Sequence, residues 1–176
     1  DEHINLISFS SLFNESGKDG YGDFTDLQTT VDAGSTYDFV LKPKFSWSYY
    51  DEYIRVWIDL NQDSDFNDPG EMVLETISEA GTPHYPPTPV DIINTSITIP
   101  SEVISGATRM RVSMQRGSFA EPCDFFVYGE VEDYTVVINT TTNLEGSDDI
   151  FYFKANPSDR AVQLNWTINT DYKTAQ

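Results

Sequence analysis

Helical periodicity is almost absent from this sequence, and short runs that alternate apolar and polar residues take its place. Gly, Pro, Asn and Asp separate these runs. Residues 108–115 are the clearest case, because apolar Met and Val side chains alternate there with Arg109, Arg111 and Ser113. Successive side chains of a β-strand point to opposite faces, so alternation predicts strands with one buried face. The pattern therefore predicts an all-β protein.

About eight such runs precede residue 140, and their hairpin-like spacing is typical of an antiparallel β-sandwich or a jelly roll. The pattern alone does not separate a sandwich from a barrel. Residues 81–89 contain four prolines, which exclude a central strand and predict a surface loop. The predicted strands are residues 4–9, 24–30, 36–41, 53–59, 72–77, 94–99, 108–115 and 131–139.

A polar segment divides the chain into a long part and a short part. We expect residues 1–139 to form the β-sandwich and residues 140–149 to form a linker. Beyond it, residues 150–153 and 162–168 predict two more strands. Two strands alone are marginally stable in water. Residues 150–176 are therefore either extension strands that pair elsewhere or the start of a second β-module.

The segment 59–71 is unusually rich in oxygen-bearing side chains and follows the apolar run 54–58 directly. Carboxylates this dense repel one another, and a cation would relieve that repulsion. Ca²⁺ takes about 6–8 oxygen ligands from carboxylates, amides and backbone carbonyls. The sequence predicts a calcium site in this loop, with a solvated acidic turn as the alternative. The candidate ligands are Asp59, Asn61, Asp63, Asp65, Asp68 and Glu71.

The spacing of these ligands resembles the start of an EF-hand loop, in which ligands occupy alternating positions. Ser64 stands where that loop has glycine, and Gly70 stands where it has its last acidic ligand. The flanking segments are not amphipathic helices. We therefore expect an Asp-rich calcium loop on a β scaffold. Mg²⁺ is the weaker candidate, because it keeps its waters and rarely takes an all-protein cage.

The charge balance is strongly acidic, with 29 acidic and 10 basic residues and a formal net charge of −19. Nucleic-acid phosphates and anionic membrane surfaces both need Lys and Arg, so neither is an expected partner. The sequence also lacks the run of about 20 apolar residues that a membrane-spanning helix requires.

Acidic residues outside the loop are further candidate calcium ligands. Glu130 and Glu132 should share one face of a strand, with Asp133 on the other face. We expect at least one of them to complete the first calcium site or to form part of a second; a polar strand edge is the alternative. Asp23 and Asp26 are weaker candidates for a second site, since acidic residues are common in turns.

Aromatic side chains are the candidates for ligand contact. Trp47, Tyr49 and Tyr85 could stack on sugar rings or anchor a peptide partner. In the alternative interpretation, Trp47 and Tyr49 face the core. The single cysteine, Cys123, is expected to be buried as a small hydrophobe.

Catalytic chemistry has little support in the sequence. The two histidines, His3 and His84, have no plausible nucleophile or Cys/His cluster as partner, which argues against a zinc site or a histidine-based triad. We expect no enzymatic activity.

Several ordered motifs resemble the GEVED domain family. Residues 129–134 read Gly-Glu-Val-Glu-Asp-Tyr, residues 21–25 read Tyr-Gly-Asp-Phe-Thr, and residues 56–66 read Val-Trp-Ile-Asp-Leu-Asn-Gln-Asp-Ser-Asp-Phe. Arg109-Met-Arg-Val and Pro122-Cys also match. The departures are Leu60 for an aromatic residue and Ser64 for glycine. The resemblance covers roughly residues 4–139 and implies an accessory domain of secreted multidomain bacterial proteins.

The tail carries a second, shorter resemblance. The run from Asn156 to Thr167 is similar to the start of modules that precede the C-terminal sorting domain of type IX-secreted Bacteroidota proteins. That resemblance implies export to the cell surface or the medium.

The expected function is a non-catalytic, calcium-binding β-sandwich module of a secreted or cell-surface protein. Such a module would position an attached enzyme on extracellular polysaccharide or protein. The alternative is a structural or adhesive repeat, or a subunit of an extracellular filament that binds neighbouring copies by strand exchange.

Overall fold

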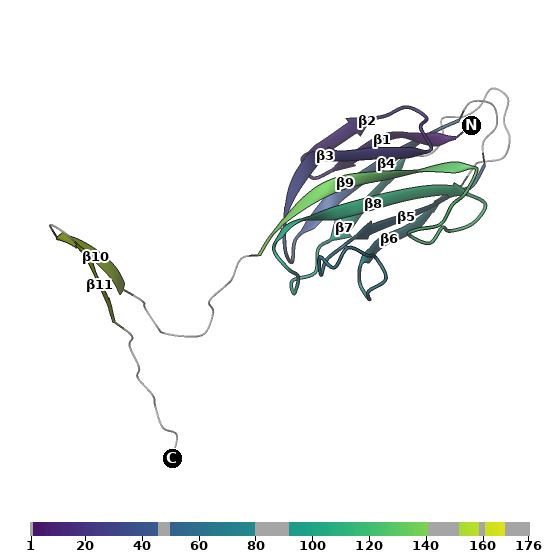
Figure 1. Cartoon of the computed structure of the whole chain (residues 1–176). Coiled ribbons are helices and arrows are strands. Elements are labelled where there is room, and N and C mark those ends of the chain that lie inside the picture. Colours follow the sequence, from purple (N-terminus) through teal and green to yellow (C-terminus); the bar gives the residue numbers. More distant parts are fainter. Residues whose placement is uncertain (1, 46–49, 80–91, 141–151, 159–160, 168–176) are drawn as a thin grey trace, which may run out of the picture. The chain divides into compact units, whose positions relative to one another are not determined.

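The computed structural model describes residues 2–45, 50–79 and 92–140, together with the backbone of residues 152–158 and 161–167 (Figure 1). The chain divides into two compact units, Asp1–Thr141 and Thr142–Gln176. Every regular element in the described residues is a β-strand. The all-β class predicted from the alternating pattern is confirmed.

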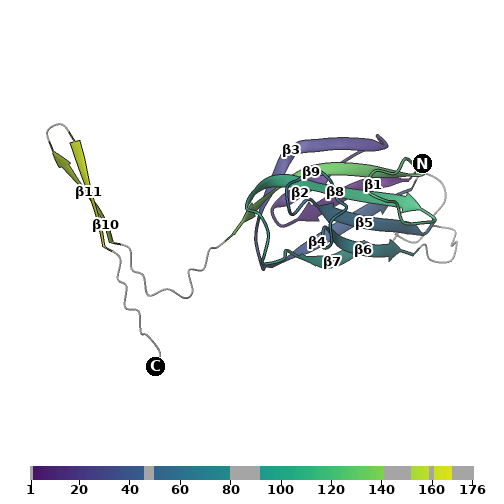
Figure 2. The same ribbon diagram turned by 60° about the horizontal axis from the view of Figure 1, so that its bottom comes forward.

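Two sheets build the first unit, and they lie face to face as two layers (Figure 1, Figure 2). The larger sheet has the order β3 (Tyr21–Asp32), β9 (Gly129–Asn139), β8 (Gly106–Arg116), β5 (Glu52–Ile58) and β6 (Met72–Ser78). The smaller sheet has the order β2 (Leu12–Glu15), β1 (His3–Phe9), β4 (Thr36–Lys44) and β7 (Ile93–Thr98). This arrangement is an open β-sandwich.

One strand pairing departs from the antiparallel pattern. Strands β3 and β9 run parallel, from the pair Tyr21↔Val131 to the pair Asp32↔Asn139. All other neighbours in the two sheets are antiparallel. Alternation reveals that a segment is a strand but carries no information about its partner, so the sequence did not predict this parallel pair.

Strand β2 lies outside the strands predicted from the sequence. It has four residues and pairs with β1 from Phe9↔Leu12 to Leu6↔Glu15. A strand this short leaves almost no periodic signal, and its pairing with β1 decides its conformation.

The space between the sheets holds one hydrophobic core to which both layers contribute. Met110, Val112 and Met114 of β8 point into it, as the alternation of residues 108–115 predicted, and all three are fully buried. Phe39 packs from the opposite sheet, with Phe9 edge-on at 6.2 Å between ring centroids. Each such side chain contributes roughly 1.5–3 kcal/mol of burial free energy.

The second unit contains one antiparallel hairpin. Strand β10 (Tyr152–Ser158) pairs with β11 (Ala161–Thr167), from Tyr152↔Thr167 to Ser158↔Ala161. Strand β11 matches the predicted strand 162–168, whereas β10 overlaps the predicted strand 150–153 only at residues 152 and 153.

All three predicted contact residues, Trp47, Tyr49 and Tyr85, lie outside the described residues, as does the proline-rich segment 81–89. The described residues include no helix that is long and apolar enough to cross a membrane.

Candidate metal centre

The acidic loop, residues 59–71, connects β5 to β6 at one edge of the larger sheet, and hydrogen bonds fix both of its ends. Ile58 N donates to Glu71 O at 2.9 Å, and Asp59 N donates to Arg109 O at 3.0 Å. The Thr108 hydroxyl donates to Asp59 O at 2.6 Å. The loop therefore begins and ends on the rigid β5–β6–β8 part of the sheet.

Two of the predicted ligands are buried and hold the loop backbone. Asp59 accepts hydrogen bonds from the backbone N–H groups of Asp63 at 3.2 Å and Ser64 at 3.1 Å. Glu71 accepts one from Leu60 N at 2.9 Å. Burial raises the pKa of Glu71 above its ordinary value, while hydrogen bonds from the backbone N–H groups of Asn61, Leu60 and Asp68 act in the opposite direction. Both carboxylates therefore stabilise the conformation of the loop backbone.

A repeated turn motif spaces the remaining side chains. Asn61 Oδ1 accepts from Asp63 N at 3.0 Å, Asp63 Oδ1 from Asp65 N at 3.1 Å, and Asp65 Oδ1 from Asn67 N at 2.8 Å. Each is an Asx turn, in which a side chain binds the backbone N–H two residues further on. The alternation of Asn and Asp in the sequence is the local signal for this winding.

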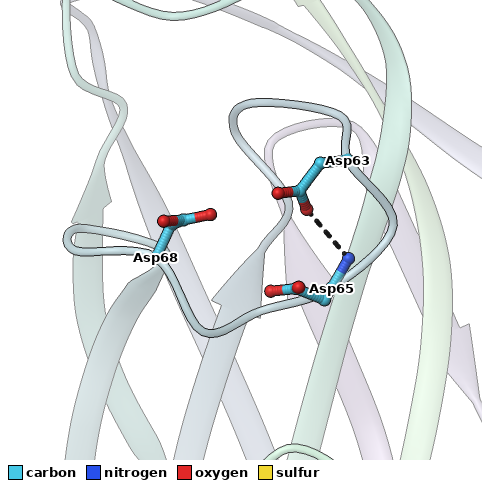
Figure 3. Close-up of side chains that lie close together, drawn as sticks. All are labelled: Asp63, Asp65 and Asp68. Carbon is cyan, nitrogen blue, oxygen red and sulfur yellow. Dashed lines mark hydrogen bonds between the residues drawn. The ribbon is translucent and has the colours of Figure 1, made fainter.

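Three carboxylates of the loop converge at its surface. Asp63, Asp65 and Asp68 are exposed, and one oxygen from each lies within 4.8 Å of the others (Figure 3). The Asn61 amide donates to Asp63 at 3.1 Å and to Asp68 at 2.7 Å, so it bridges two of them. This cluster of oxygens could hold a metal ion. The structure thus divides the six predicted ligands into two buried framework residues and an exposed group of four.

The loop contains a strained position that the sequence had marked. Ser64 has a φ of 77°, in the left-handed region that glycine adopts without cost. We expect Ser64→Gly to raise the free energy of unfolding by about 1 kcal/mol, since a side chain in this region costs roughly 1–2 kcal/mol. Urea denaturation measures the change. Ser64→Ala is the control, because it removes the hydroxyl but keeps the strain; a matching gain in that variant would contradict the backbone explanation.

A hollow of about 680 Å³ lies beside the loop on the outer face of the larger sheet. Asp65 and Phe66 line it from the loop, and Arg109 and Arg111 line it from β8. Cys123 also lines it and is exposed, so the expectation of a buried thiol was wrong. The reason is that residues near it cross the outer face of the sheet, where they cover polar side chains and not the core.

The structure does not bring Glu130 to the acidic loop. Glu130 is buried, and its Oε2 accepts from Ile4 N at 2.8 Å. Its Oε1 accepts from Asp19 N at 2.9 Å and from Gly20 N at 3.2 Å. The carboxylate therefore joins β9 to the first 20 residues of the chain, and its described contacts are with backbone donors.

Glu132 has a similar position one step along the inner face of β9. It is buried, and it accepts hydrogen bonds from the hydroxyls of Ser16 and Tyr134, the second at 2.7 Å. Tyr134 in turn accepts from the Asn14 amide at 2.9 Å. Neither Glu130 nor Glu132 has a described hydrogen bond to the loop, so the geometry gives both a structural role.

Burial gives Glu132 a pH-dependent effect on stability. Desolvation raises its pKa from 4.5 to about 7. The folded protein thus keeps a proton that the unfolded chain releases, and stability should fall by roughly 1–3 kcal/mol as the pH rises from 4.5 to 7. Glu132→Gln should reduce this slope in urea titrations with chelator across that range. An unchanged slope in the variant would show that Glu132 titrates normally.

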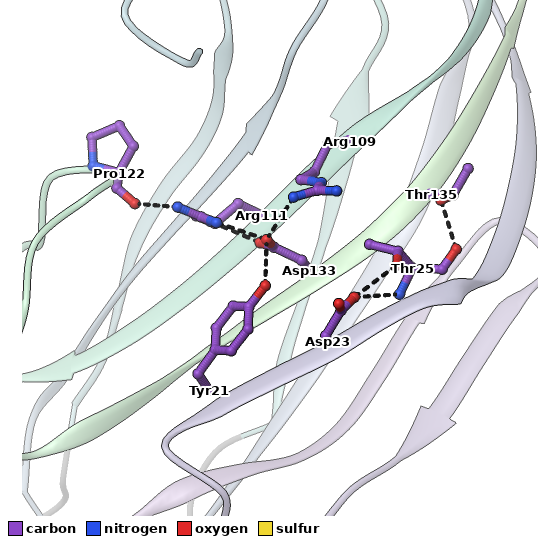
Figure 4. A network of polar contacts seen from close by, with 8 residues as sticks. All are labelled: Tyr21, Asp23, Thr25, Arg109, Arg111, Pro122, Asp133 and Thr135. Atoms are coloured by element: carbon purple, nitrogen blue, oxygen red, sulfur yellow. Dashed lines mark hydrogen bonds and ion pairs between the residues drawn. The ribbon is translucent and has the colours of Figure 1, made fainter. Parts of the chain in front are cut away.

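Asp133 lies on the opposite face of β9, as the alternation predicted, within an ion-pair network (Figure 4). It is fully buried and binds Arg111 through two hydrogen bonds, at 2.7 and 2.6 Å. The Tyr21 hydroxyl donates to it at 3.0 Å, and Arg109 lies 3.5 Å away. Arg111 also donates to Pro122 O at 2.8 Å. The network joins β3, β9, β8 and the segment after β8.

The weaker acidic candidates behave as turn and edge residues. Asp23 accepts from the backbone N–H and the hydroxyl of Thr25, at 3.1 and 2.7 Å, and these hydrogen bonds lower its pKa (Figure 4). Asp26 is exposed where the β3–β9 register shifts. No described contact connects either residue to the acidic loop.

Sequence reasoning missed the role of Arg111. The sequence signal was limited to the alternation of Arg111 with apolar residues. In the structure, the register of β8 and β9 pairs Arg111 directly with Asp133. That register depends on the pairing of two strands that are separated in the sequence, so residue types alone did not reveal it.

The two sheets, the acidic loop and the ion-pair network define a β-sandwich domain with a candidate metal centre at one end. Residues 53–137 match the model of the GEVED domain, which confirms the resemblance carried by the sequence motifs. The family is one of accessory domains, not catalytic ones, and its members occur in secreted bacterial proteins. The comparison with curated proteins found no match. The resemblance of the tail to a type IX secretion-associated module is not borne out.

Proposed function

We propose that this domain is a non-catalytic, calcium-stabilised module of a secreted or cell-surface protein. The observation that supports the proposal is the convergence of Asp63, Asp65 and Asp68 at the surface of the acidic loop, with one oxygen of each within 4.8 Å of the others. Three carboxylates this close repel one another, and a divalent cation would offset that repulsion.

Calcium fits the donor set better than other metals do. The described residues of the cluster are carboxylates and an amide, and the group contains no sulfur or imidazole ligand. Oxygen ligands favour Ca²⁺ and Mg²⁺, and Ca²⁺ tolerates the irregular geometry of a loop. Exposure of the cluster leaves room for water ligands. The ion's task would be to stabilise the connection between β5 and β6.

We further propose that the module positions an attached enzyme on extracellular polysaccharide or protein. The hollow beside the loop supports this view, since Phe66 presents an aromatic ring there and the half-exposed Arg109 presents a charge. Aromatic residues and arginine are enriched at protein–protein interfaces. The strongly acidic surface makes nucleic acid an unsuitable partner.

Calcium binding is tested by thermal and urea unfolding of the chelator-treated chain with and without added Ca²⁺. A concentration of 100 times the dissociation constant should stabilise the folded state by about 2.7 kcal/mol. The same concentration of Mg²⁺ should have a smaller effect.

Paired variants locate the site. Asp63→Asn together with Asp65→Asn should abolish most of the calcium-dependent gain. Asp26→Asn, which removes an exposed charge far along the chain from the loop, should leave it intact. If metal analysis of the chelated protein shows an empty site and added Ca²⁺ changes neither stability nor calorimetric heat, the proposal fails.

A further inference from the structure

The connection between β8 and β9 exposes several neighbouring apolar side chains. Residues 125–128 read Phe-Phe-Val-Tyr, and Phe125 is 94% exposed and Val127 77% exposed. Tyr128 is exposed as well. Single apolar side chains are common on protein surfaces, but large ones that gather in one place mark binding surfaces. We call residues 125–128 the apolar segment.

Hydrogen bonds fix the backbone on both sides of the apolar segment. Before it, Arg111 donates to Pro122 O at 2.8 Å (Figure 4). At its end, Arg116 N donates to Tyr128 O at 3.2 Å. The exposed side chains therefore project from a backbone that is anchored to the larger sheet, and a partner would lose little affinity to the ordering of this segment.

A second hollow, of about 380 Å³, lies between the apolar segment and the start of β3. Phe125, Phe126 and Pro122 line it from the β8–β9 connection, and Tyr21 lines it from β3. The hydroxyl of Tyr21 is held by Asp133, and its side chain is half exposed. Four ring-bearing side chains thus border a concave site, whose volume is within the range of about 300–1,000 Å³ that is usual for ligand pockets.

The net charge that lines this hollow is negative. Its charged residues are Asp19, Arg111 and Asp124. Asp133 binds Arg111 at 2.7 and 2.6 Å and so neutralises it, whereas Asp19 and Asp124 are exposed at the surface. The formal net charge of −19 on the whole chain adds to the attraction for cations.

We propose that the apolar segment and the second hollow bind a basic segment of an extracellular protein, in which Lys or Arg stands next to apolar residues. Long basic side chains bury their aliphatic stems on apolar surface and keep the charged end in water. Here the stem would pack on Phe125 and Phe126, and the charged end would lie beside Asp19 and Asp124. This partner deepens the proposed positioning function, on which it rests, because it selects protein over polysaccharide.

Charge argues against the other occupants. A second copy of the chain would bring its own net charge of −19 to the contact, and an acidic polysaccharide would meet Asp19 and Asp124. A neutral polysaccharide could stack on the rings, but it would gain nothing from the excess of negative charge. A basic segment with apolar neighbours uses both features of the surface.

The test measures the binding of labelled octapeptides to the full chain by fluorescence anisotropy, with chelator present and at physiological salt. The probe alternates Lys with Leu, and two control peptides alternate Lys with Ser and Glu with Leu. The Lys–Leu peptide should bind at least about tenfold more tightly than either control, because it alone combines apolar burial with opposite charge. Added salt should weaken its binding.

Matched variants locate the contact. Phe125→Ser should weaken binding of the Lys–Leu peptide by roughly tenfold or more, since burying a Phe side chain contributes about 1.5–3 kcal/mol. Asp19→Asn together with Asp124→Asn should also weaken it and should reduce its salt dependence. Phe13→Ser on β2 and Asp38→Asn on β4 replace an exposed Phe and an exposed Asp of the smaller sheet, and both should leave the affinity unchanged.

Three results would overturn the proposal. Equal affinity for the Lys–Ser peptide, or unchanged affinity after Phe125→Ser, would show non-specific attraction to an acidic chain. Binding of neutral cellohexaose that Phe125→Ser abolishes would assign the surface to a glycan and would keep the positioning function. Self-association in sedimentation that Phe125→Ser removes would assign it to a second copy. Because chelator is present throughout, none of these results bears on calcium binding, which the unfolding experiments test separately.

Discussion

Asp133→Asn is expected to lower the free energy of unfolding by about 3 kcal/mol or more, measured by urea denaturation. Removing one partner of a buried ion pair costs roughly 3–5 kcal/mol, since the other charge stays buried without its counter-ion. Here the charge that remains is Arg111, whose side chain is only 17% exposed. Asn occupies nearly the same volume, so the loss reports on charge and not on packing. Tyr21 would also lose a charged acceptor.

A double replacement tests whether the loss of stability comes from the charge that is left unpaired. Arg111→Met combined with Asp133→Leu should be less destabilising than the sum of the two single changes, because it leaves no buried charge unpaired. Arg109→Met is the control: Arg109 is half exposed and 3.5 Å from Asp133, so its replacement should cost under about 1 kcal/mol. A loss below that value for Asp133→Asn itself would contradict the role assigned to the network.

Glu130→Ala is expected to have an effect of similar size. Its carboxylate accepts from the N–H groups of Ile4, Asp19 and Gly20, and the truncation leaves all three without this acceptor. Hydrogen bonds to charged groups contribute roughly 1.5–3 kcal/mol each, so a total loss of at least about 3 kcal/mol follows even if water replaces one of them.

Hydrogen exchange provides the matching local measurement. The amide of Ile4 should exchange much faster in Glu130→Ala than in the parent chain, while Glu130→Gln, which keeps one acceptor oxygen, should fall between them. A loss under about 1 kcal/mol together with unchanged protection of Ile4 would show that the hydrogen bonds of Glu130 contribute little to stability.

These two predictions change the interpretation of the Gly-Glu-Val-Glu-Asp run. Three acidic residues within four positions predict a metal site from sequence alone. In the structure, Glu130 and Glu132 bind donors from the first 20 residues, and Asp133 binds Arg111 on the other face. The motif therefore connects one face of β9 to the first 20 residues and the other face to Arg111 of β8.

Local patterns were sufficient for the class of fold and for the gathering of acidic side chains in the loop 59–71. Alternation in segments such as residues 108–115 reflects the geometry of a single strand, so it can be recognised without knowing any partner. The Asn61–Asp63–Asp65 spacing is equally local, because each side chain winds the loop by binding the backbone two residues further on.

Pairing between segments distant in the sequence determined the features that local patterns did not predict. The parallel β3–β9 pair, the short strand β2 and the separation of Glu130 from the acidic loop all depend on segments that meet only after folding. Burial decides the role of each carboxylate: Asp59 and Asp63 are alike in sequence, yet one is buried against backbone donors and the other is exposed in the carboxylate cluster. A residue's solvation and partners are set by the whole fold, and these determine what its charge can do.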